Sequence, residues 1–243
     1  MTDETRFERW LRDGERTEGD AIPAATVVLV RERSGTIETL MLRKNSKIAF
    51  GGMWVFPGGR IDDEDRVGAP DVATAARRAA VREAAEEAGL AVDEESLAWI
   101  SHWLPPGIAP KRYATWFFVA PAPGGDVTID GGEIHESDWM QPRDALTRRD
   151  ALEIELAPPT WMTLHYLGAF DDLDSLMRDA AAREPFFYET HIAKGAGGIV
   201  ALWAGDVGYG VEGLDDAALE AEGPRHRLWM ADPWRLEREL PSG

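Results

Sequence analysis

Three glutamates, Glu83, Glu86 and Glu87, occur within five residues of the stretch REAAEEAGL, which spans residues 82–90. An alanine-rich run precedes them and Gly89 follows, a pattern typical of a helix that ends in a left-handed glycine. At about 100° per residue, the three side chains fall within a sector of roughly 100°. The same sector contains five apolar residues: Val72, Ala76, Ala79, Ala80 and Leu90. The glutamates therefore lie on an apolar stripe.

The opposite side of this helix is also apolar. It carries Val81, Ala84, Ala85 and Ala88, which predicts a helix that is covered on both faces. Its expected N-cap is Asp71, so the helix should run from about Val72 to Ala88.

The glutamate cluster has two possible interpretations. On an exposed helix, like charges three or four residues apart cost only about 0.2–0.5 kcal/mol per pair, so the cluster could be a solvated acidic helix end. Partly buried carboxylates, in contrast, lose hydration and need a proton or a cation. The chain has no cysteine, and a group of oxygen ligands suits a hard cation such as Mg²⁺ or Mn²⁺. The helix alone leaves both interpretations open.

A second motif lies upstream of the helix. Phe56-Pro57-Gly58-Gly59, followed by REAAEEAGL, resembles the signature of the Nudix hydrolases. The second half of that signature is matched in full, with Ala84 as its small aliphatic residue. The first half departs from it, because the segment between Gly59 and Arg82 is nine residues longer than in the strict pattern.

The longer segment puts Thr74 where the signature has its first glutamate. A replacement could come from one of four nearby aspartates: Asp62, Asp63, Asp65 or Asp71. A longer loop at this place is similar to the branch of the family that includes the peroxisomal coenzyme A diphosphatases. Trp139 and the sequence Leu156-Ala157-Pro158-Pro159-Thr160 agree with that branch.

The resemblance implies a hydrolase that uses Mg²⁺ or Mn²⁺ to cleave the diphosphate bond of a nucleoside diphosphate derivative. It implies that Glu83 and Glu87 are the main metal ligands, that Glu86 holds a further ion or its waters, and that a carbonyl of Gly58 or Gly59 completes the shell. It also implies that Arg82 orients the glutamates.

A general base would come from a later loop, which supplies Glu133 and Glu136. We prefer Glu136 because of its position before Trp139, although either residue could be an ordinary surface carboxylate. His135 is expected to be exposed and unrelated to catalysis. Contacts to phosphate could come from basic residues that flank the expected site: Arg43, Lys44, Lys47, Arg60, Lys111 and Arg112. Each of them could equally be a solvated side chain.

The expected elements surround these motifs. Strands are predicted at residues 25–30, 36–43, 97–103 and 113–120, with a short one ending at Met140, and helices at about 142–150, 158–168 and 171–182. Two further β-like runs lie at 198–203 and 226–230. Strands mixed with helices indicate an α/β or α+β domain, and the resemblance implies a Nudix-like α/β/α sandwich with a mixed β-sheet. We expect a flexible arm at 1–20, the Nudix hydrolase domain at 21–184 and a C-terminal extension at 185–243.

Composition limits the possible partners. The chain has 243 residues and a formal net charge of −18, which disfavours binding to nucleic acid or to an anionic membrane. No apolar run approaches the ~18 residues that span a bilayer, and the absence of cysteine agrees with a cytoplasmic protein. The expected partner is a small nucleoside diphosphate derivative, and a homodimer is possible.

The sequence leaves alternatives open for the substrate and for whether the protein is a catalyst. Coenzyme A or an acyl-CoA, cleaved to 3′,5′-ADP and a 4′-phosphopantetheine product, is the first expectation. ADP-ribose or NADH is the alternative within the same class. A non-catalytic Nudix-fold nucleotide sensor is the alternative from another class, and the intact set of Arg82 with its glutamates argues against it.

Overall fold

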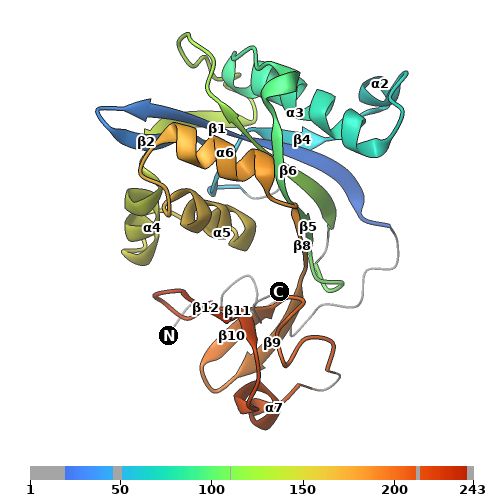
Figure 1. Cartoon of the computed structure of the whole chain (residues 1–243), viewed down its shortest axis with the longest axis vertical. Coiled ribbons are helices and arrows are strands. Elements are labelled where there is room, and N and C mark those ends of the chain that lie inside the picture. Colours follow the sequence, from blue (N-terminus) through green and yellow to red (C-terminus); the bar gives the residue numbers. More distant parts are fainter. Residues whose placement is uncertain (1–19, 46–50, 110, 212–213, 240–243) are drawn as a thin grey trace. The chain divides into compact units, whose positions relative to one another are not determined.

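A computed structural model of the chain describes residues 20–45, 51–109, 111–211 and 214–239 (Figure 1). It divides into two compact units. We call Pro23–His102 with Thr115–Phe186 the large unit, and the stretches Trp103–Ala114 and Phe187–Gly243 with the N-terminal residues through Ile22 the small unit. The expected arm at 1–20 lies almost wholly outside the described residues. No helix in the described ranges has the length and apolar character needed to cross a membrane.

Eight of the described strands form one sheet. They are β1 (Ile22–Arg33), β2 (Thr36–Lys44), β3 (Trp54–Val55), β4 (Gly58–Arg60), β5 (Ala98–Leu104), β6 (Tyr113–Pro121), β7 (Ile134–Met140) and β8 (Phe186–Glu189). The order is β3-β2-β1-β6-β5-β8, with β4 paired to β1 and β7 paired to β2. The predicted strands are confirmed. The sequence pattern did not predict β3, β4 and β8, which have only two, three and four residues.

The helices of the large unit are α2 (Asp63–Arg66), α3 (Val72–Ala88), α4 (Pro142–Asp150), α5 (Pro158–Leu167) and α6 (Leu173–Ala182), with a 3-10 turn at Glu94–Ser96. In Figure 1, α3 lies on one side of the sheet and α4, α5 and α6 lie on the other. The alternation of strand side chains explains this arrangement. Val27, Leu29, Leu40 and Leu42 pack in one cluster with the alanines of α3. Their neighbours Val28 and Val30 are also fully buried, so both faces of the sheet are covered. The predicted α+β class is confirmed.

Helix α3 begins and ends where the sequence predicted. The Asp71 side chain accepts a hydrogen bond from Thr74 N, and Gly89 stops the helix with φ 69°. The expectation that both faces are covered is wrong at two positions, because Ala85 is exposed and Val72 is 41% exposed. The row of small side chains at Ala76, Ala80 and Ala84 packs closely on the sheet. The residues at 85 and 86 point to solvent instead.

The small unit contains a second sheet of antiparallel strands. It is formed by β9 (His191–Gly195), β10 (Gly198–Leu202), β11 (Arg225–Trp229) and β12 (Arg235–Glu239), in the order β12-β11-β10-β9, with the short helix α7 (Asp216–Glu220). Its interior holds the stacked rings of Trp103 and Tyr188, whose centroids are 3.8 Å apart. It also holds the buried ion pair of Asp206 and Arg227, with a shortest distance of 2.6 Å. The two predicted β-like runs of the tail correspond to β10 and β11.

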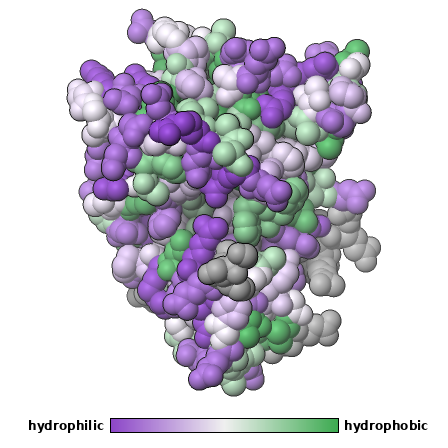
Figure 2. All heavy atoms as spheres, in the orientation of Figure 1, coloured by the Kyte–Doolittle hydropathy of each residue, from purple (hydrophilic) through white to green (hydrophobic). Residues whose placement is uncertain are grey.

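The visible surface is polar, in line with the net charge of −18. Figure 2 shows hydrophilic side chains over most of the face that it draws, with apolar residues in scattered spots.

Candidate active site

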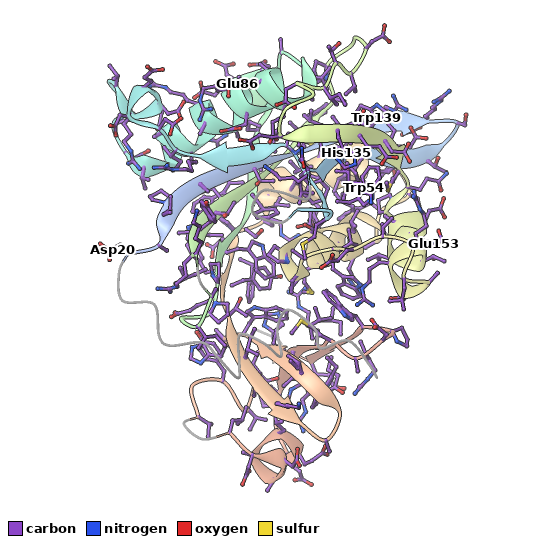
Figure 3. The ribbon with its side chains drawn as sticks, turned by 180° about the vertical axis from the view of Figure 1, so that it is seen from behind. Asp20, Trp54, Glu86, His135, Trp139 and Glu153 are labelled. Atoms are coloured by element: carbon purple, nitrogen blue, oxygen red, sulfur yellow. The ribbon has the colours of Figure 1, made fainter. Side chains whose placement is uncertain are left out.

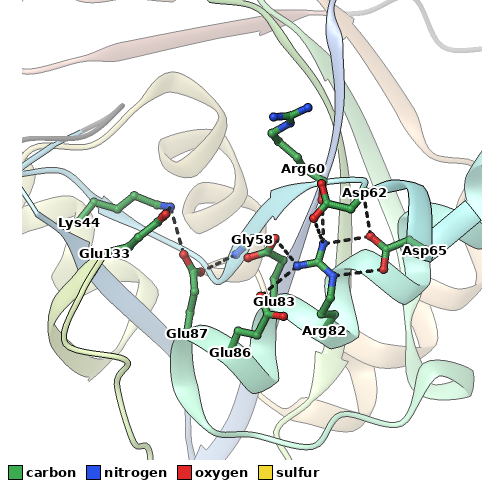
Figure 4. Close-up of polar contacts among 10 residues, drawn as sticks. All are labelled: Lys44, Gly58, Arg60, Asp62, Asp65, Arg82, Glu83, Glu86, Glu87 and Glu133. Carbon is green, nitrogen blue, oxygen red and sulfur yellow. Dashed lines mark hydrogen bonds and ion pairs between the residues drawn. The ribbon is translucent and has the colours of Figure 1, made fainter.

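Arg82 is the centre of a polar cluster on α3 (Figure 4). Its Nη1 donates to Glu83 Oε1 at 2.9 Å and to Glu86 Oε2 at 3.0 Å. Its Nη2 donates to the carbonyl oxygen of Arg60 at 2.9 Å, which ties α3 to the end of β4. The guanidinium therefore holds the neighbouring carboxylates in defined positions.

The other side of the Arg82 guanidinium meets Asp65. Nε lies 3.2 Å from Asp65 Oδ1 and Nη2 lies 3.0 Å from Oδ2, a two-point contact that Arg makes well with a carboxylate. Asp65 is 6% exposed, and its Oδ2 also accepts from Asp62 N at 2.9 Å. Of the four aspartates considered as a replacement for the missing glutamate, Asp65 makes the buried contact with Arg82, whereas Asp71 caps α3. The longer loop before α3 thus provides a carboxylate through the short helix α2.

Glu87 lies at the other end of the cluster and is 4% exposed. Its Oε1 is 3.1 Å from Lys44 Nζ, and its Oε2 accepts from Gly58 N at 2.9 Å. Lys44 Nζ is also 3.6 Å from Glu133 Oε2, in the loop before β7. Residues from β2, β4, α3 and this loop thus meet around one carboxylate.

The two glycines of β4 lie so close to their neighbours that an added side chain would force those neighbours to move. A Cβ on Gly59 would lie 2.3 Å from Glu83 Oε1, and one on Gly58 would lie 2.4 Å from Thr26 Oγ1 and 2.5 Å from the carbonyl oxygen of Ala25. Glycine at position 59 lets the main chain approach the Glu83 carboxylate. The backbone of the FPGG motif and the carboxylates of α3 are therefore in direct contact.

Burial changes the ionisation of the cluster. The pKa of Glu83 is raised to about 7, mainly because burial disfavours its charged form, although Arg82 favours that form. Burial alone would lower the pKa of the Lys44 ammonium, but Glu87, together with Glu133 and Glu83, outweighs burial and the pKa is raised. The bonds to Asp65 and Glu83 also raise the pKa of Arg82, despite its partial burial. The cluster thus contains a carboxyl group that titrates near neutral pH.

Carboxyl groups outnumber cations among the side chains in contact here. Six carboxyl groups, of Asp62, Asp65, Glu83, Glu86, Glu87 and Glu133, accompany the two cations of Arg82 and Lys44. In the described ranges, no three acidic or histidine side chains are grouped so that they could hold a metal ion as they now stand. The donors nevertheless fit a hard cation, since they are all oxygens and since burial of Glu83 favours any added positive charge. Lys44 already holds one oxygen of Glu87, at 3.1 Å.

Several expected residues lie elsewhere. Arg43 and Glu136 pair at 3.1 Å. They are on the sheet face opposite to α3, because Arg43 and Lys44 are adjacent on β2 and point to opposite sides. The β2–β7 register also shifts between these two positions. His135 is exposed, as expected, and Figure 3 shows it on β7 with Trp139.

The remaining basic candidates are Arg60, Lys111, Arg112 and Lys47. The Arg60 guanidinium points away from the glutamates in Figure 4, and only its carbonyl meets Arg82. Lys111 and Arg112 belong to the small unit. Lys47 lies outside the described residues. Among the basic candidates in the described part of the large unit, Lys44 is the one whose side chain contacts the cluster.

The contact between Lys44 and Glu87 was not foreseen from the sequence. A signal existed in the alternation of β2, since Leu40 and Leu42 face the α3 alanines and Lys44 follows at the same spacing. This alternation predicts the contact only if one already knows that α3 covers that face of the sheet.

Comparisons with known proteins show which proteins the chain is similar to. The family model described as the NUDIX domain matches residues 21–160. A NUDIX hydrolase from Alicyclobacillus acidocaldarius is 24% identical, with a TM-score of 0.62, over 67% of this chain and 97% of that one. A MutT NUDIX hydrolase from Burkholderia pseudomallei is 19% identical, with a TM-score of 0.46, over 60% of this chain and 98% of that one. The match to the Alicyclobacillus acidocaldarius protein supports the fold. No curated protein matches the sequence significantly.

Proposed function

The chain belongs to the Nudix family of hydrolases, and we propose that it cleaves the diphosphate bond of a nucleoside diphosphate derivative with the help of Mg²⁺ or Mn²⁺. One observation carries this proposal. The Glu83 and Glu87 carboxylates project from one end of α3 toward the main chain of Gly59 and Gly58. The more exposed Glu86 lies beside them, and Arg82 is bonded to both Glu83 and Glu86. An anionic substrate can enter so acidic a place only if cations accompany it.

The ligands in this proposal are Glu83, Glu86 and Glu87 with a carbonyl of Gly58 or Gly59. A bound divalent cation would neutralise the diphosphate and stabilise the negative charge that develops as water attacks phosphorus. Arg82 acts by position, since its donors all lead to Asp65, to the Arg60 carbonyl and to the glutamates themselves. Asp65 in turn holds Arg82.

Glu133 is the better candidate for the general base. Its carboxylate is 63% exposed and lies 3.6 Å from Lys44 Nζ, on the side of the sheet that α3 covers. Glu136, which we preferred from the sequence, pairs with Arg43 on the other side. In the proposed mechanism, Glu133 accepts a proton from the attacking water.

Coenzyme A or an acyl-CoA is the first substrate to test, because the sequence resembles that branch of the family. The residues of that resemblance have structural roles in this fold. Leu156 and Ala157 are buried, Pro158 begins α5, and Trp139 lies under the Arg31 guanidinium at 4.0 Å. Because residues with structural roles do not by themselves select a substrate, ADP-ribose and NADH are kept as the alternative substrates. In this proposal residues 21–184 form the catalytic domain and 185–243 an extension.

The proposal is tested by incubating the protein with Mg²⁺ and each of CoA, an acyl-CoA, ADP-ribose and NADH, and by identifying the products by mass. We expect 3′,5′-ADP and a 4′-phosphopantetheine product from CoA, and none when EDTA replaces Mg²⁺. Hydrolysis of ADP-ribose or NADH alone would support the diphosphatase and reject the CoA assignment. Tight binding of one compound without turnover of any would favour the sensor.

A further inference from the structure

Lys44 is a cation built into the carboxylate cluster. Its side chain is 14% exposed and that of Glu87 is 6% exposed, so their contact of 3.1 Å is largely shielded from water. Charges in such surroundings interact more strongly than exposed ones. The Glu87 oxygen that faces Lys44 is Oε1, since Oε2 is occupied by Gly58 N. A second cation that binds Glu87 through Oε1 therefore competes with Lys44 for that oxygen.

The main chain of Lys44 is held by two hydrogen bonds, whereas its side chain has a second carboxylate, that of Glu133, within reach. Lys44 N donates to Met53 O at 3.1 Å, and Lys44 O accepts from Gly52 N at 2.9 Å. The ammonium on its four-carbon stem can move without these bonds breaking. The second carboxylate, of Glu133, is already 3.6 Å away and is 63% exposed, so it can follow the ammonium.

The other cation of the cluster has no such freedom. The Arg82 donors are engaged by Asp65, the Arg60 carbonyl, Glu83 and Glu86. Breaking the buried contact with Asp65 would leave a charge without its partner, which is costly. Of the two cations in the cluster, Lys44 is the one that can turn toward a phosphate oxygen.

We propose that Lys44 and a divalent cation compete for Glu87, and that the ammonium, once displaced, stays beside Glu133 and binds the diphosphate of the substrate. The inference rests on the proposed function, because it takes Glu87 as a metal ligand. It deepens that function by making the cation that binds phosphate available only when the metal is bound. Metal binding and substrate binding are then coupled through one side chain.

The proposal predicts effects of opposite sign in Lys44→Met. Methionine has a similar length and no charge, so the competitor for Glu87 is lost and Mn²⁺ should bind about five- to tenfold more tightly. The phosphate contact is lost as well, so ADP should bind the Mn²⁺-loaded protein at least fivefold more weakly. If Lys44 merely supported the fold, its replacement would weaken the binding of both Mn²⁺ and ADP.

Mn²⁺ affinity is measured by electron paramagnetic resonance of free Mn²⁺, and ADP affinity by calorimetry at saturating Mn²⁺. The matched control is Arg31→Met, which removes a partly buried cation from its 2.6 Å pair with Glu38, elsewhere on the β1–β2 hairpin. It should leave both affinities unchanged. Circular dichroism verifies that each variant is folded, and Lys44→Gln, which retains a polar end, serves if methionine is not tolerated.

Unchanged or weaker Mn²⁺ binding in a folded Lys44 variant would overturn the competition, even if the wild-type protein hydrolyses its substrate. ADP binding as tight as in the wild type would overturn the phosphate contact. Failure of the wild type to bind Mn²⁺ at all would instead reject the proposed function.

The wild type offers a direct check, because it has only four lysines, Lys44, Lys47, Lys111 and Lys194. After ¹³C-methylation, the Lys44 signal should shift on Mg²⁺ addition and that of Lys194 should not.

Discussion

Gly59→Ala separates the stability of the fold from the function of the site. A Cβ at this position would lie 2.3 Å from Glu83 Oε1, 2.5 Å from its carboxyl carbon and 2.8 Å from Oε2. Gly59 is not among the glycines with positive φ, so its backbone conformation accepts alanine. The crowding atoms belong to the end of a flexible side chain, and the Glu83 carboxylate has to retreat by about 1 Å, a displacement that can cost roughly 10²-fold in rate.

We expect Gly59→Ala to change the free energy of unfolding by less than about 1 kcal/mol, because main-chain contacts are kept. Mg²⁺-dependent hydrolysis should fall by about 30- to 100-fold. The assays are urea unfolding in EDTA and steady-state kinetics at several Mg²⁺ concentrations. The control is Gly124→Ala, where a Cβ meets nothing within 4 Å. If Gly59→Ala retained activity within threefold of that control, the contact between β4 and Glu83 would have no functional role.

Three further variants test other parts of the account. Glu83 has a pKa of about 7 in the folded protein against 4.5 as its ordinary value, so its ionisation lowers the stability of the fold as the pH rises through this range. In EDTA, the free energy of unfolding of Glu83→Gln should therefore gain about 1–3 kcal/mol over that of the wild type between pH 5 and pH 8. A difference between the two proteins that does not depend on pH would contradict this. Asp65→Asn should lower the free energy of unfolding by about 2–3 kcal/mol and reduce the rate of hydrolysis, because Arg82 loses its charged partner. The control is Asp63→Asn at an exposed position, and equal effects of the two substitutions would refute the role of Asp65. Asp206→Asn should destabilise the protein by about 3–5 kcal/mol in chemical unfolding, because it leaves Arg227 buried without a counter-charge, and a loss below 1 kcal/mol would be inconsistent with that pair.

Local signals in the sequence were sufficient to predict the helix that carries the glutamates. Asp71 and Gly89 mark the ends of α3 through their own backbone and side-chain preferences, and the structure has both caps. The pattern of α3 also predicted that its glutamates share a stripe with buried alanines. It failed at Ala85, because periodicity shows which residues share a face and does not show how far the covering sheet extends.

Contacts that depend on the fold could not be predicted. Four aspartates were candidates to replace the missing glutamate of the signature, and the contact of Asp65 with Arg82 depends on how the longer loop folds into α2. Likewise, Glu133 and Glu136 are three residues apart in sequence but lie on opposite sides of the sheet, with a register shift between them. Lys44 was expected to bind phosphate, yet in the structure it binds Glu87.

The central claim is that the α3 carboxylates hold the cation that makes diphosphate hydrolysis possible. Its most direct test is the Mg²⁺-dependent hydrolysis rate of Glu87→Gln, compared with the wild type on the best substrate of the panel. Glutamine keeps the shape of the side chain and the bond to Gly58 N but removes the charge. We predict a fall in rate of at least about 100-fold. Hydrolysis within threefold of the wild type would contradict the metal assignment.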